Sequence, residues 1–227
     1  MGKKNIILLV GLIVLGLIIV IFFLSPSQQS SDLSDNINAS RDLSSNISFT
    51  GNVSAEIPGD HVLGSYNSEN TIIEYASLTC PHCAIFHGEV FPKIKSELID
   101  KGKVKYIFRD FPIDPLAMAG SMIAHCSGDS KYFGVIDVLL KTQDEWLFDN
   151  ENPYNGLLKV ARLAGLSEEN VKVCLSDNEL FSMIEGNQKL ASSRFGVNGT
   201  PAIFVNNKKI SSLDFDTIMD ELGITAD

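Results

Sequence analysis

The stretch TIIEYASLTCPHCAIFH, residues 71–87, decides the fold because it joins a strand, a cysteine pair and a helix in one short run. The β-branched and aromatic residues before the pair predict a buried strand. After Cys80 and Cys83, apolar residues recur every fourth position and predict one face of a helix, with a kink at Pro92. These apolar residues are Phe86, Val90, Ile94 and Leu98. A second strand is predicted near Val104–Arg109, and this β–α–β order favours parallel strands with a right-handed crossover.

The chain after this unit is predicted to be mainly helical until a late pair of strands. Helix-forming residues and apolar faces predict a series of helices through residues 115–195. The stretch TPAIFVNNKKI, residues 200–210, predicts a hairpin of two strands that turns at Asn206–Asn207. Residues 213–224 then predict a closing helix.

We expect one α/β fold with an inserted lobe rather than two sequential domains, because strands flank the helices on both sides. Residues 58–112 and 194–227 would form the sheet domain, and residues 113–193 the inserted helical domain. Residues 25–57 are rich in serine and asparagine and poor in aromatics, so they bury too little apolar surface to offset the entropy of ordering. We therefore expect a flexible polar linker there, and a short association element within it is the alternative.

Residues 1–24 have the composition of a membrane-targeting segment. Lys3 and Lys4 precede an uncharged apolar run, residues 6–24, which as a transmembrane helix would span about 28 Å, close to one hydrocarbon core. The run is longer than a typical signal-peptide core and ends without a small-residue cleavage site, which favours a signal anchor over a cleaved signal peptide. The lysines favour the cytoplasmic side. We therefore expect the rest of the chain in the periplasm, anchored to the inner membrane by this run or released there after cleavage.

An exported protein can keep its cysteines oxidised, and the four cysteines form an even set. Cys80 and Cys83 are the local pair, which leaves Cys126 with Cys174 in the predicted helical lobe. We expect this second pair to be a structural disulfide that stiffens the lobe and modestly shifts the redox potential of the local pair. Two free buried thiols and a regulatory disulfide are the alternatives.

The local pair is predicted to contain two cysteines of unequal reactivity. If the helix begins near Cys80, the unpaired N–H groups of its first turn and the positive end of its macrodipole face the sulfur. His82 can add a hydrogen bond or a positive charge, and Pro81 suits a first turn, where an N–H has no helical partner. These effects lower the Cys80 pKa below its usual value of about 8.5. Cys80 would then exchange with a partner, and Cys83 would resolve the mixed disulfide.

A metal site and a purely structural disulfide are two other interpretations of the local pair. A zinc site needs about four ligands, usually from a second C-x-x-C or a histidine pair at matching spacing. His61, His87 and His125 remain, but none stands in such a motif. We therefore predict no metal site, and we expect His61 and His125 to be ordinary surface or packed histidines.

Three stretches together resemble the bacterial DsbA family of thiol–disulfide oxidoreductases within the thioredoxin superfamily. They are TIIEYASLTCPHCAIFH, the helical stretch that follows it, and GVNGTPAIFVNN, and the resemblance covers roughly residues 60–227. It implies a thioredoxin-like fold with the helical domain inserted between strand and hairpin. It also implies a cis peptide bond before Pro201, in a loop that faces the cysteine pair and whose Thr200 backbone can pair with a bound substrate strand.

The resemblance further implies roles for two residues near the pair. Glu74, six positions before Cys80, stands where such proteins have a buried acidic residue, which suggests proton handling during exchange. A strand-end glutamate that faces solvent is the alternative. His87 stands one turn past Cys83, where some relatives have a second acidic group, so the sequence leaves the route of proton transfer open.

The sequence therefore predicts an enzyme that introduces disulfide bonds into exported proteins through the Cys80-Pro81-His82-Cys83 pair. It would act on unfolded or folding proteins, be reoxidised by a membrane partner of the DsbB type, and need no cofactor beyond its own cysteines. The formal net charge of −10 argues against a nucleic-acid partner. A disulfide isomerase or reductase on the same fold is the nearest alternative, and a periplasmic metal-binding or chaperone-like module is a second.

Overall fold

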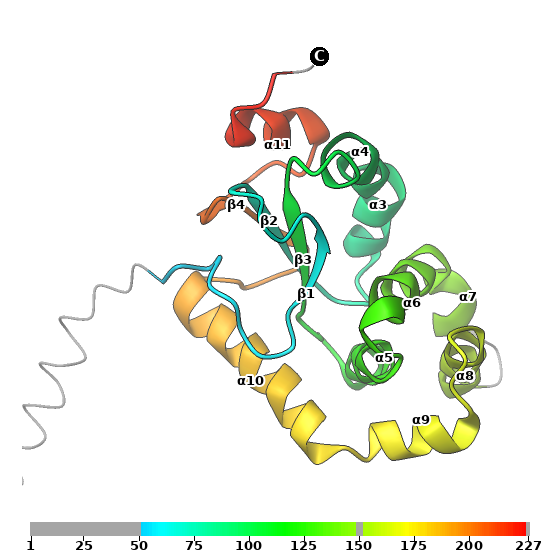
Figure 1. Ribbon diagram of the computed structural model, residues 1–227. Coiled ribbons are helices and arrows are strands. Elements are labelled where there is room, and N and C mark those ends of the chain that lie inside the picture. Colours follow the sequence, from blue (N-terminus) through cyan, green and yellow to red (C-terminus); the bar gives the residue numbers. More distant parts are fainter. Residues whose placement is uncertain (1–50, 149–151, 226–227) are drawn as a thin grey trace, which may run out of the picture. The chain divides into compact units, whose positions relative to one another are not determined.

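The computed structural model describes residues 51–148 and 152–225 of the 227-residue chain, so the predicted targeting segment and most of the predicted linker lie outside the described residues. Within the described residues, no helix is both long enough and apolar enough to cross a membrane. The strands of this part form one five-stranded sheet in the order β1-β3-β2-β4-β5 (Figure 1). They are β1 His61–Gly64, β2 Thr71–Ala76, β3 Lys105–Asp110, β4 Ala202–Val205 and β5 Lys208–Lys209.

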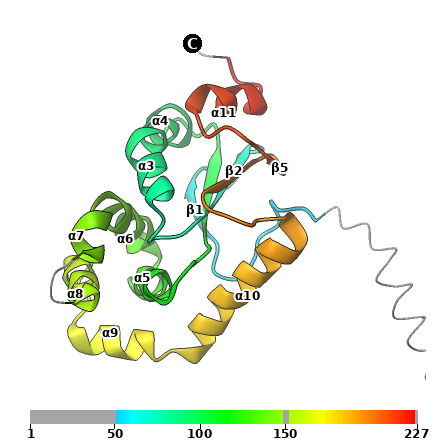
Figure 2. The ribbon, with the colours of Figure 1, turned by 180° about the vertical axis from the view of Figure 1, so that it is seen from behind.

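Helices surround the sheet and form the inserted lobe (Figures 1 and 2). Those described are α3 Pro81–Glu89, α4 Phe91–Ile94, the π-helical turn η1 Lys95–Ile99, α5 Pro115–Cys126, α6 Asp129–Lys141, α7 Gln143–Leu147, α8 Pro153–Leu163, α9 Glu168–Leu175, α10 Asn178–Phe195 and α11 Phe215–Leu222. The predicted kink takes the form of a break, because α3 ends at Glu89 and Pro92 lies in the first turn of α4. The predicted boundary between residues 193 and 194 falls inside α10, so this helix belongs to both the lobe and the sheet domain.

The central strand of the sheet is β2, which lies parallel to β3 and antiparallel to β4. The parallel pair confirms the predicted β–α–β unit. The antiparallel pairing of β4 with β5 confirms the predicted hairpin, and Asn206 and Asn207 both have positive φ, as the tight turn requires. Because Tyr75 lies opposite Ala202, the turn after β2 comes close to the loop before β4.

The edge strand β1 was not predicted from the sequence. It pairs antiparallel with β3, but its run HVLG is short and only partly buried, so it carries neither a clear alternation nor a long apolar run. The strand ends at Gly64, whose φ is 95°, and a Cβ there would lie 2.7 Å from the Val104 carbonyl oxygen. Only glycine combines this left-handed conformation with so close an approach.

Alternation along β2 divides the core into two parts, one on each face of the sheet. Ile72 and Ala76 belong to the larger core, which also contains residues of α3, α6 and α11. Ile73 and Tyr75 belong to a smaller core, which contains residues of α10 and of the segment before β1. Glu74 lies between Ile72 and Ala76 in the sequence, so its side chain faces the larger core and α3.

The predicted linker is wrong in its last residues, because residues 51–57 pack on the sheet domain. Val53 is 1% exposed. Arg109 of β3 donates hydrogen bonds to the carbonyl oxygens of Val53 at 2.7 Å and Ala55 at 2.8 Å, and it forms an ion pair with Asp60 at 2.7 Å. The segment has no apolar periodicity of its own, and it is held by a buried arginine from a distant strand.

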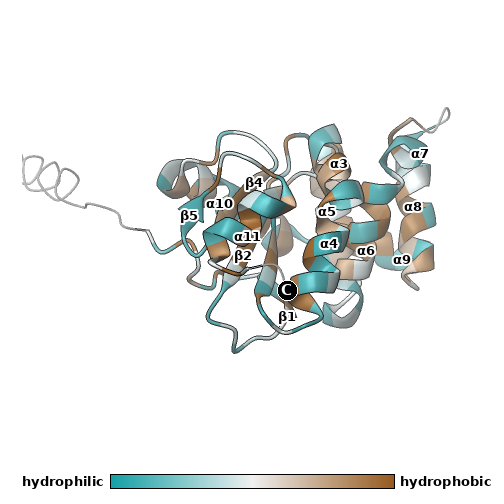
Figure 3. Ribbon diagram, turned by 90° about the horizontal axis from the view of Figure 1, so that it is seen from above, coloured by the Kyte–Doolittle hydropathy of each residue, from teal (hydrophilic) through white to brown (hydrophobic). Residues whose placement is uncertain are grey.

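The helices of the lobe pack around α6. The apolar face of α6 explains why this helix lies at the centre of the lobe. Buried residues recur along this helix at helical spacing, whereas polar residues lie elsewhere on it (Figure 3). The buried residues are Tyr132, Val135, Ile136, Leu139 and Leu140. Trp146 of α7 packs closely on α8, where a Cβ at Gly156 would lie 2.6 Å from the Trp146 Cβ. Its indole N–H also donates to the Leu139 carbonyl oxygen at 2.7 Å, so α7 is fixed to both α6 and α8.

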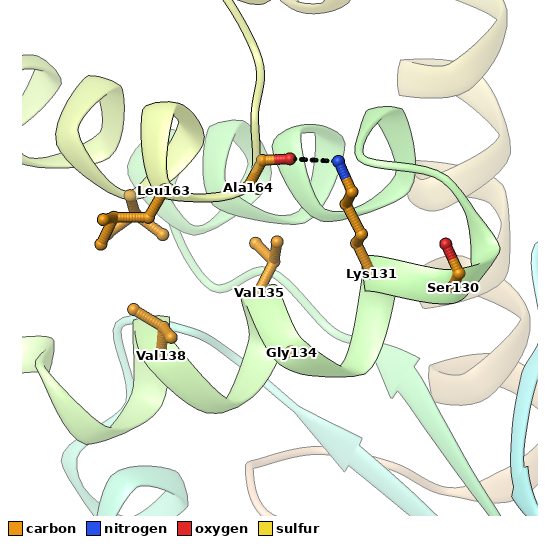
Figure 4. A pocket seen from close by; sticks show the side chains of 8 residues that line it. Ser130, Lys131, Gly134, Val135, Val138, Leu163 and Ala164 are labelled. Atoms are coloured by element: carbon orange, nitrogen blue, oxygen red, sulfur yellow. Dashed lines mark hydrogen bonds between the residues drawn. The ribbon is translucent and has the colours of Figure 1, made fainter.

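An apolar pocket of about 410 Å³ lies between α6 and α8 (Figure 4). Valine side chains and Leu163 line it, and the Lys131 ammonium group donates to the Ala164 carbonyl oxygen at 2.7 Å at its edge. Neither Cys80 nor Cys83 contributes to its lining, so this pocket is separate from the cysteine turn.

A disulfide joins Cys126 of α5 to Cys174 of α9 across a sequence separation of 48 residues. We expect the variant Cys126→Ala/Cys174→Ala to lose about 4 kcal/mol of unfolding free energy, because the unfolded chain gains the conformational entropy of an open loop. Urea denaturation of the full-length chain in detergent measures this loss. An unchanged unfolding midpoint, together with an unchanged redox potential of the local pair, would contradict the role that we assign to this disulfide.

Candidate active site

The cysteine turn connects the central strand β2 to α3. The Cys80 N–H donates to the Ser77 carbonyl oxygen at 3.1 Å, which closes the turn, and α3 begins at Pro81 with Cys80 as its N-cap residue. Pro81 fits this position because the first N–H groups of a helix have no partner within it. The predicted start of the helix is therefore confirmed, and Cys80 lies where the helix favours negative charge.

Cys80 lies in surroundings that favour its thiolate. Its pKa is lowered to about 5, first because the Cys83 thiol donates a hydrogen bond to the Cys80 sulfur, although burial opposes this. The Thr200 side chain and the backbone N–H groups of Cys83 and His82 lower the pKa further. In the thiol form, the Cys80 Sγ–H donates to the Thr200 carbonyl oxygen at 3.3 Å, a contact that favours the protonated form and is outweighed by the donors.

Cys83 lies one turn further along α3 in surroundings of the opposite kind. The residue is completely buried, at 0% exposure, whereas Cys80 is 6% exposed. Hydrogen bonding to Cys80, burial and the negative charge of Glu74 all raise the pKa of Cys83. Cys80 is therefore both the accessible sulfur and the better leaving group.

The loop before β4 forms the opposite side of the site. The Thr200–Pro201 peptide bond is cis, as the family resemblance implies. The antiparallel pairing of β4 with β2 places this loop beside the cysteine turn. Thr200 thus reaches Cys80 although the two residues are 120 positions apart in the sequence.

A buried cluster of titratable side chains lies near Cys83. Glu74 is 0% exposed, so the alternative of a solvent-facing glutamate is wrong. Its Oε2 accepts hydrogen bonds from the Tyr106 hydroxyl and from His87 Nε2, the latter at 2.9 Å. Burial and the charge of Glu74 raise the pKa of Tyr106. The Glu74 carboxylate therefore acts electrostatically on both Cys83 and Tyr106.

His87 and Tyr106 complete this cluster. The sequence points to His87 but not to Tyr106. His87 was noted as a departure from relatives, and it is buried with its ring stacked on Phe91 at 4.5 Å. Tyr106 was missed because an aromatic residue in a strand ordinarily indicates packing, but its position opposite Ile72 places it on the face of Glu74. Glu74 Oε1 and His87 Nδ1 are buried and have no hydrogen-bond partner among the described residues. Buried polar atoms without a partner are costly in a core, so these two atoms mark the cluster as more than packing.

His82 lowers the Cys80 pKa in a different way from the one expected. Thr79 and Asp114 also stabilise the cysteine turn. The His82 side chain is exposed, and the residue lowers the Cys80 pKa through its backbone N–H. Thr79 Oγ1 donates to Asp114 Oδ2 at 2.5 Å, and Asp114 also caps the N-terminus of α5. An aspartate directly before Pro115 is a recognisable helix start, so this signal could have indicated the capping role of Asp114.

His61 and His125 form a separate cluster with Asp110 and Tyr132. His125 Nε2 lies 2.9 Å from Asp110 Oδ2, and His61 Nε2 lies 3.2 Å from His125 Nδ1. The His61 ring stacks on Tyr132 with 3.8 Å between centroids. Both are packed histidines, as expected. Across residues 51–148 and 152–225, no group of three or more His, Cys, Asp or Glu side chains is placed to hold a metal ion.

Comparisons with known proteins match this geometry. A family model described as Thioredoxin matches residues 56–222. The crystal structure of alpha-DsbA1 from Wolbachia pipientis superposes with a TM-score of 0.68 at 31% sequence identity, over 74% of this chain and 91% of that chain. This chain belongs to the DsbA family of the thioredoxin superfamily.

Two further relatives of this DsbA-family chain are known from their sequences. A Rickettsia bellii protein named "Putative protein-disulfide oxidoreductase" is 35% identical over 161 residues, which is 70% of this chain and 61% of that protein. Disulfide bond formation protein D of Bacillus subtilis is 27% identical over 177 residues, which is 73% of this chain and 77% of that protein. The aligned part therefore spans only 61% of the length of the Rickettsia relative.

We expect Glu74→Gln to lower the Cys83 pKa by about one unit, because the substitution removes the negative charge that opposes ionisation of this thiol. The comparison is between Cys80→Ala and Cys80→Ala/Glu74→Gln, so that Cys83 is the thiol of the site that titrates. Thiolate absorbance against pH reports its pKa. Glu89→Gln, at an exposed position in α3, is the matched control and should leave the pKa unchanged. Equal pKa values with and without Glu74 would show that its charge does not act on Cys83.

The low pKa of Cys80 predicts that the stability of the reduced protein depends on pH. The thiolate stabilises the folded state, so its contribution is complete above the unfolded pKa of about 8.5 and is lost as the pH falls through about 5. Between about pH 6 and pH 8, reduced wild-type protein should gain about 1.4 kcal/mol per pH unit relative to Cys80→Ser. Urea unfolding of both proteins in reductant measures the difference, and a difference independent of pH would contradict the assigned pKa.

Proposed function

We propose that this chain is a thiol–disulfide oxidoreductase that introduces disulfide bonds into exported proteins. The contrast between its two thiols carries the proposal, because the Cys80 pKa is lowered to about 5 whereas that of Cys83 is raised. A stabilised Cys80 thiolate lowers the free energy of the reduced pair. The oxidised pair then tends to accept electrons from the dithiols of other proteins.

Exchange would begin with the pair in its disulfide form. A client thiolate attacks Cys80 Sγ, forms a mixed disulfide with it and releases the Cys83 sulfur, which takes up a proton because its pKa is raised. A second client thiolate attacks the client sulfur of the mixed disulfide and displaces the Cys80 thiolate, whose low pKa makes it a good leaving group. The client gains one disulfide, and two electrons pass to the protein.

The buried cluster around Glu74 would relay a proton from solvent to Cys83 when that sulfur is released. The negative charge of Glu74 raises the pKa of Cys83, and the Glu74 carboxylate is hydrogen-bonded to both His87 and Tyr106. A carboxylate that gains a proton and passes it on to the thiolate acts as a general acid and ends each cycle unchanged. This role explains why a carboxylate occupies the centre of an otherwise apolar strand.

The loop at Thr200 would position the client beside Cys80. Its carbonyl oxygen lies 3.3 Å from Cys80 Sγ, so an extended segment that pairs with this loop would bring its own sulfur to the same place. Pro201 has no N–H group, and the pairing of β4 with β2 holds this loop beside the cysteine turn. The Thr200 side chain also lowers the Cys80 pKa, so one residue would serve both binding and reactivity.

The proposed location is the periplasm, with residues 6–24 as the anchor in the inner membrane. The two lysines before an apolar run of membrane-spanning length support this location. In that compartment a membrane partner of the DsbB type would reoxidise the pair after each transfer. The name of the Bacillus subtilis relative, Disulfide bond formation protein D, supports electron flow from client proteins to the cysteine pair.

The redox potential of the pair tests this direction. We expect the full-length chain in detergent to equilibrate with glutathione at a potential well above the value of about −270 mV for thioredoxin, because the Cys80 thiolate stabilises the reduced form. Alkylation followed by mass measurement gives the reduced fraction at each glutathione ratio. Cys80→Ser should abolish the exchange, and Cys126→Ala/Cys174→Ala should retain it. A potential near that of thioredoxin would contradict the oxidase and favour a reductase.

A further inference from the structure

Gln143, the first residue of α7, reaches from the helical lobe to the cysteine turn. Its side chain is buried, and its Nε2 donates hydrogen bonds to the Leu78 carbonyl oxygen at 2.8 Å and to the Cys80 carbonyl oxygen at 3.1 Å. Two carbonyl acceptors fix the orientation of the amide, because only its nitrogen can donate to both. One side chain of the lobe therefore holds both ends of the segment from Leu78 to Cys80.

We propose that Gln143 is a positioning residue that sets the redox properties of the cysteine pair by holding the Cys80 backbone in the geometry that favours the thiolate. The proposal rests on the proposed redox function of this pair. The hydrogen bonds of Gln143 go to backbone carbonyl groups, so it acts through the position of Cys80 and takes no direct part in sulfur exchange.

The first effect of Gln143 is geometric. The Cys80 carbonyl oxygen also accepts from the Cys83 N–H at 3.1 Å and the Ala84 N–H at 3.2 Å, which are the first hydrogen bonds of α3. Gln143 holds the same oxygen from outside the helix. The N–H groups of His82 and Cys83 lower the Cys80 pKa only while they are directed at its sulfur. Without Gln143, only the two hydrogen bonds of the helix would hold this peptide group, and the alignment would be looser.

The second effect is electrostatic and has the same sign. The donor hydrogens of an amide carry partial positive charge, and here they are directed at the peptide group that bears the reactive sulfur. In buried surroundings such a dipole acts more strongly than it would in water. In this proposal the amide dipole would favour the Cys80 thiolate without adding a formal charge.

The lobe holds Gln143 in place through both helices that neighbour α7. Thr142 Oγ1 donates to the Val138 carbonyl oxygen at 2.8 Å, which fixes the junction between α6 and α7. On the other side, Trp146 fills the space over Gly156 of α8. The amide thus has a rigid support, as a positioning residue requires.

Two substitutions of Gln143 and one control test the proposal in the full-length chain in detergent. Gln143→Met keeps the length and lacks a donor, and Gln143→Glu keeps the shape but has one donor when protonated and none when ionised. Gln188→Met is the control, because Gln188 of α10 also donates to a backbone carbonyl oxygen, that of Pro112 at 2.7 Å. The readouts are the Cys80 pKa from thiolate absorbance, the glutathione equilibrium and the unfolding free energy.

We expect both Gln143 variants to raise the Cys80 pKa by about half a unit to one unit, an effect of the size found for helix-end charges. The glutathione equilibrium should shift by about threefold to tenfold toward the disulfide, where tenfold corresponds to about 30 mV. The control should lose stability without either shift. Unchanged pKa and equilibrium in both Gln143 variants, or equal shifts in the control, would overturn the proposal whatever happens to stability.

The pKa readout separates this proposal from the proposed function. A wild-type chain that does not exchange with glutathione would refute the redox function alone, because the Cys80 pKa can still be compared between wild-type and Gln143→Met protein. A wild-type chain that exchanges as expected, with the same Cys80 pKa in all variants, would refute the role of Gln143 alone.

Discussion

The unpaired backbone N–H groups in the first turn of α3 favour negative charge on the side chain beside them, and that side chain is Cys80. The same helix carries Cys83 one turn further in, where burial and Glu74 oppose negative charge. The chemistry depends on keeping these two environments different over a distance of one helical turn. This requirement is consistent with a helix that follows a buried central strand, a carboxylate in the core, and a distant loop whose Thr200 contacts Cys80.

Much of the fold could be predicted because local patterns determine it. The strand before the cysteines, the parallel β–α–β unit, the hairpin at Asn206–Asn207 and the helical insertion all have periodicity or turn residues of their own. The elements that were missed lack such patterns. The edge strand β1 forms because β3 offers it a partner, and residues 51–57 are ordered because Arg109 supplies the hydrogen bonds that they need. Both depend on contacts between distant parts of the chain, which a single sequence does not display.

The same distinction applies to the site. Cys80 and Cys83 follow from a short motif, so the sequence was sufficient for them. The burial of Glu74 was implied only by the family resemblance, and the sequence itself left a solvent-facing side chain open. Tyr106 and Gln143 contribute through contacts across the core, and neither residue type is unusual in the element that contains it. His82 lowers the Cys80 pKa through its backbone N–H. This effect could not be predicted from the side chain that the sequence displays, because it comes from the main chain.

The separation of 120 residues between Cys80 and Thr200 has a consequence for how the chain is made. In synthesis from the N-terminus all four cysteines, Cys80, Cys83, Cys126 and Cys174, are made before Thr200 and β4. At that stage β2 has no β4 to pair with, and an open strand edge and reactive thiols are exposed together. In the proposed oxidising compartment, the order of the elements thus creates an interval in which wrong disulfides can form among the four cysteines, and this interval ends only when β4 joins the sheet.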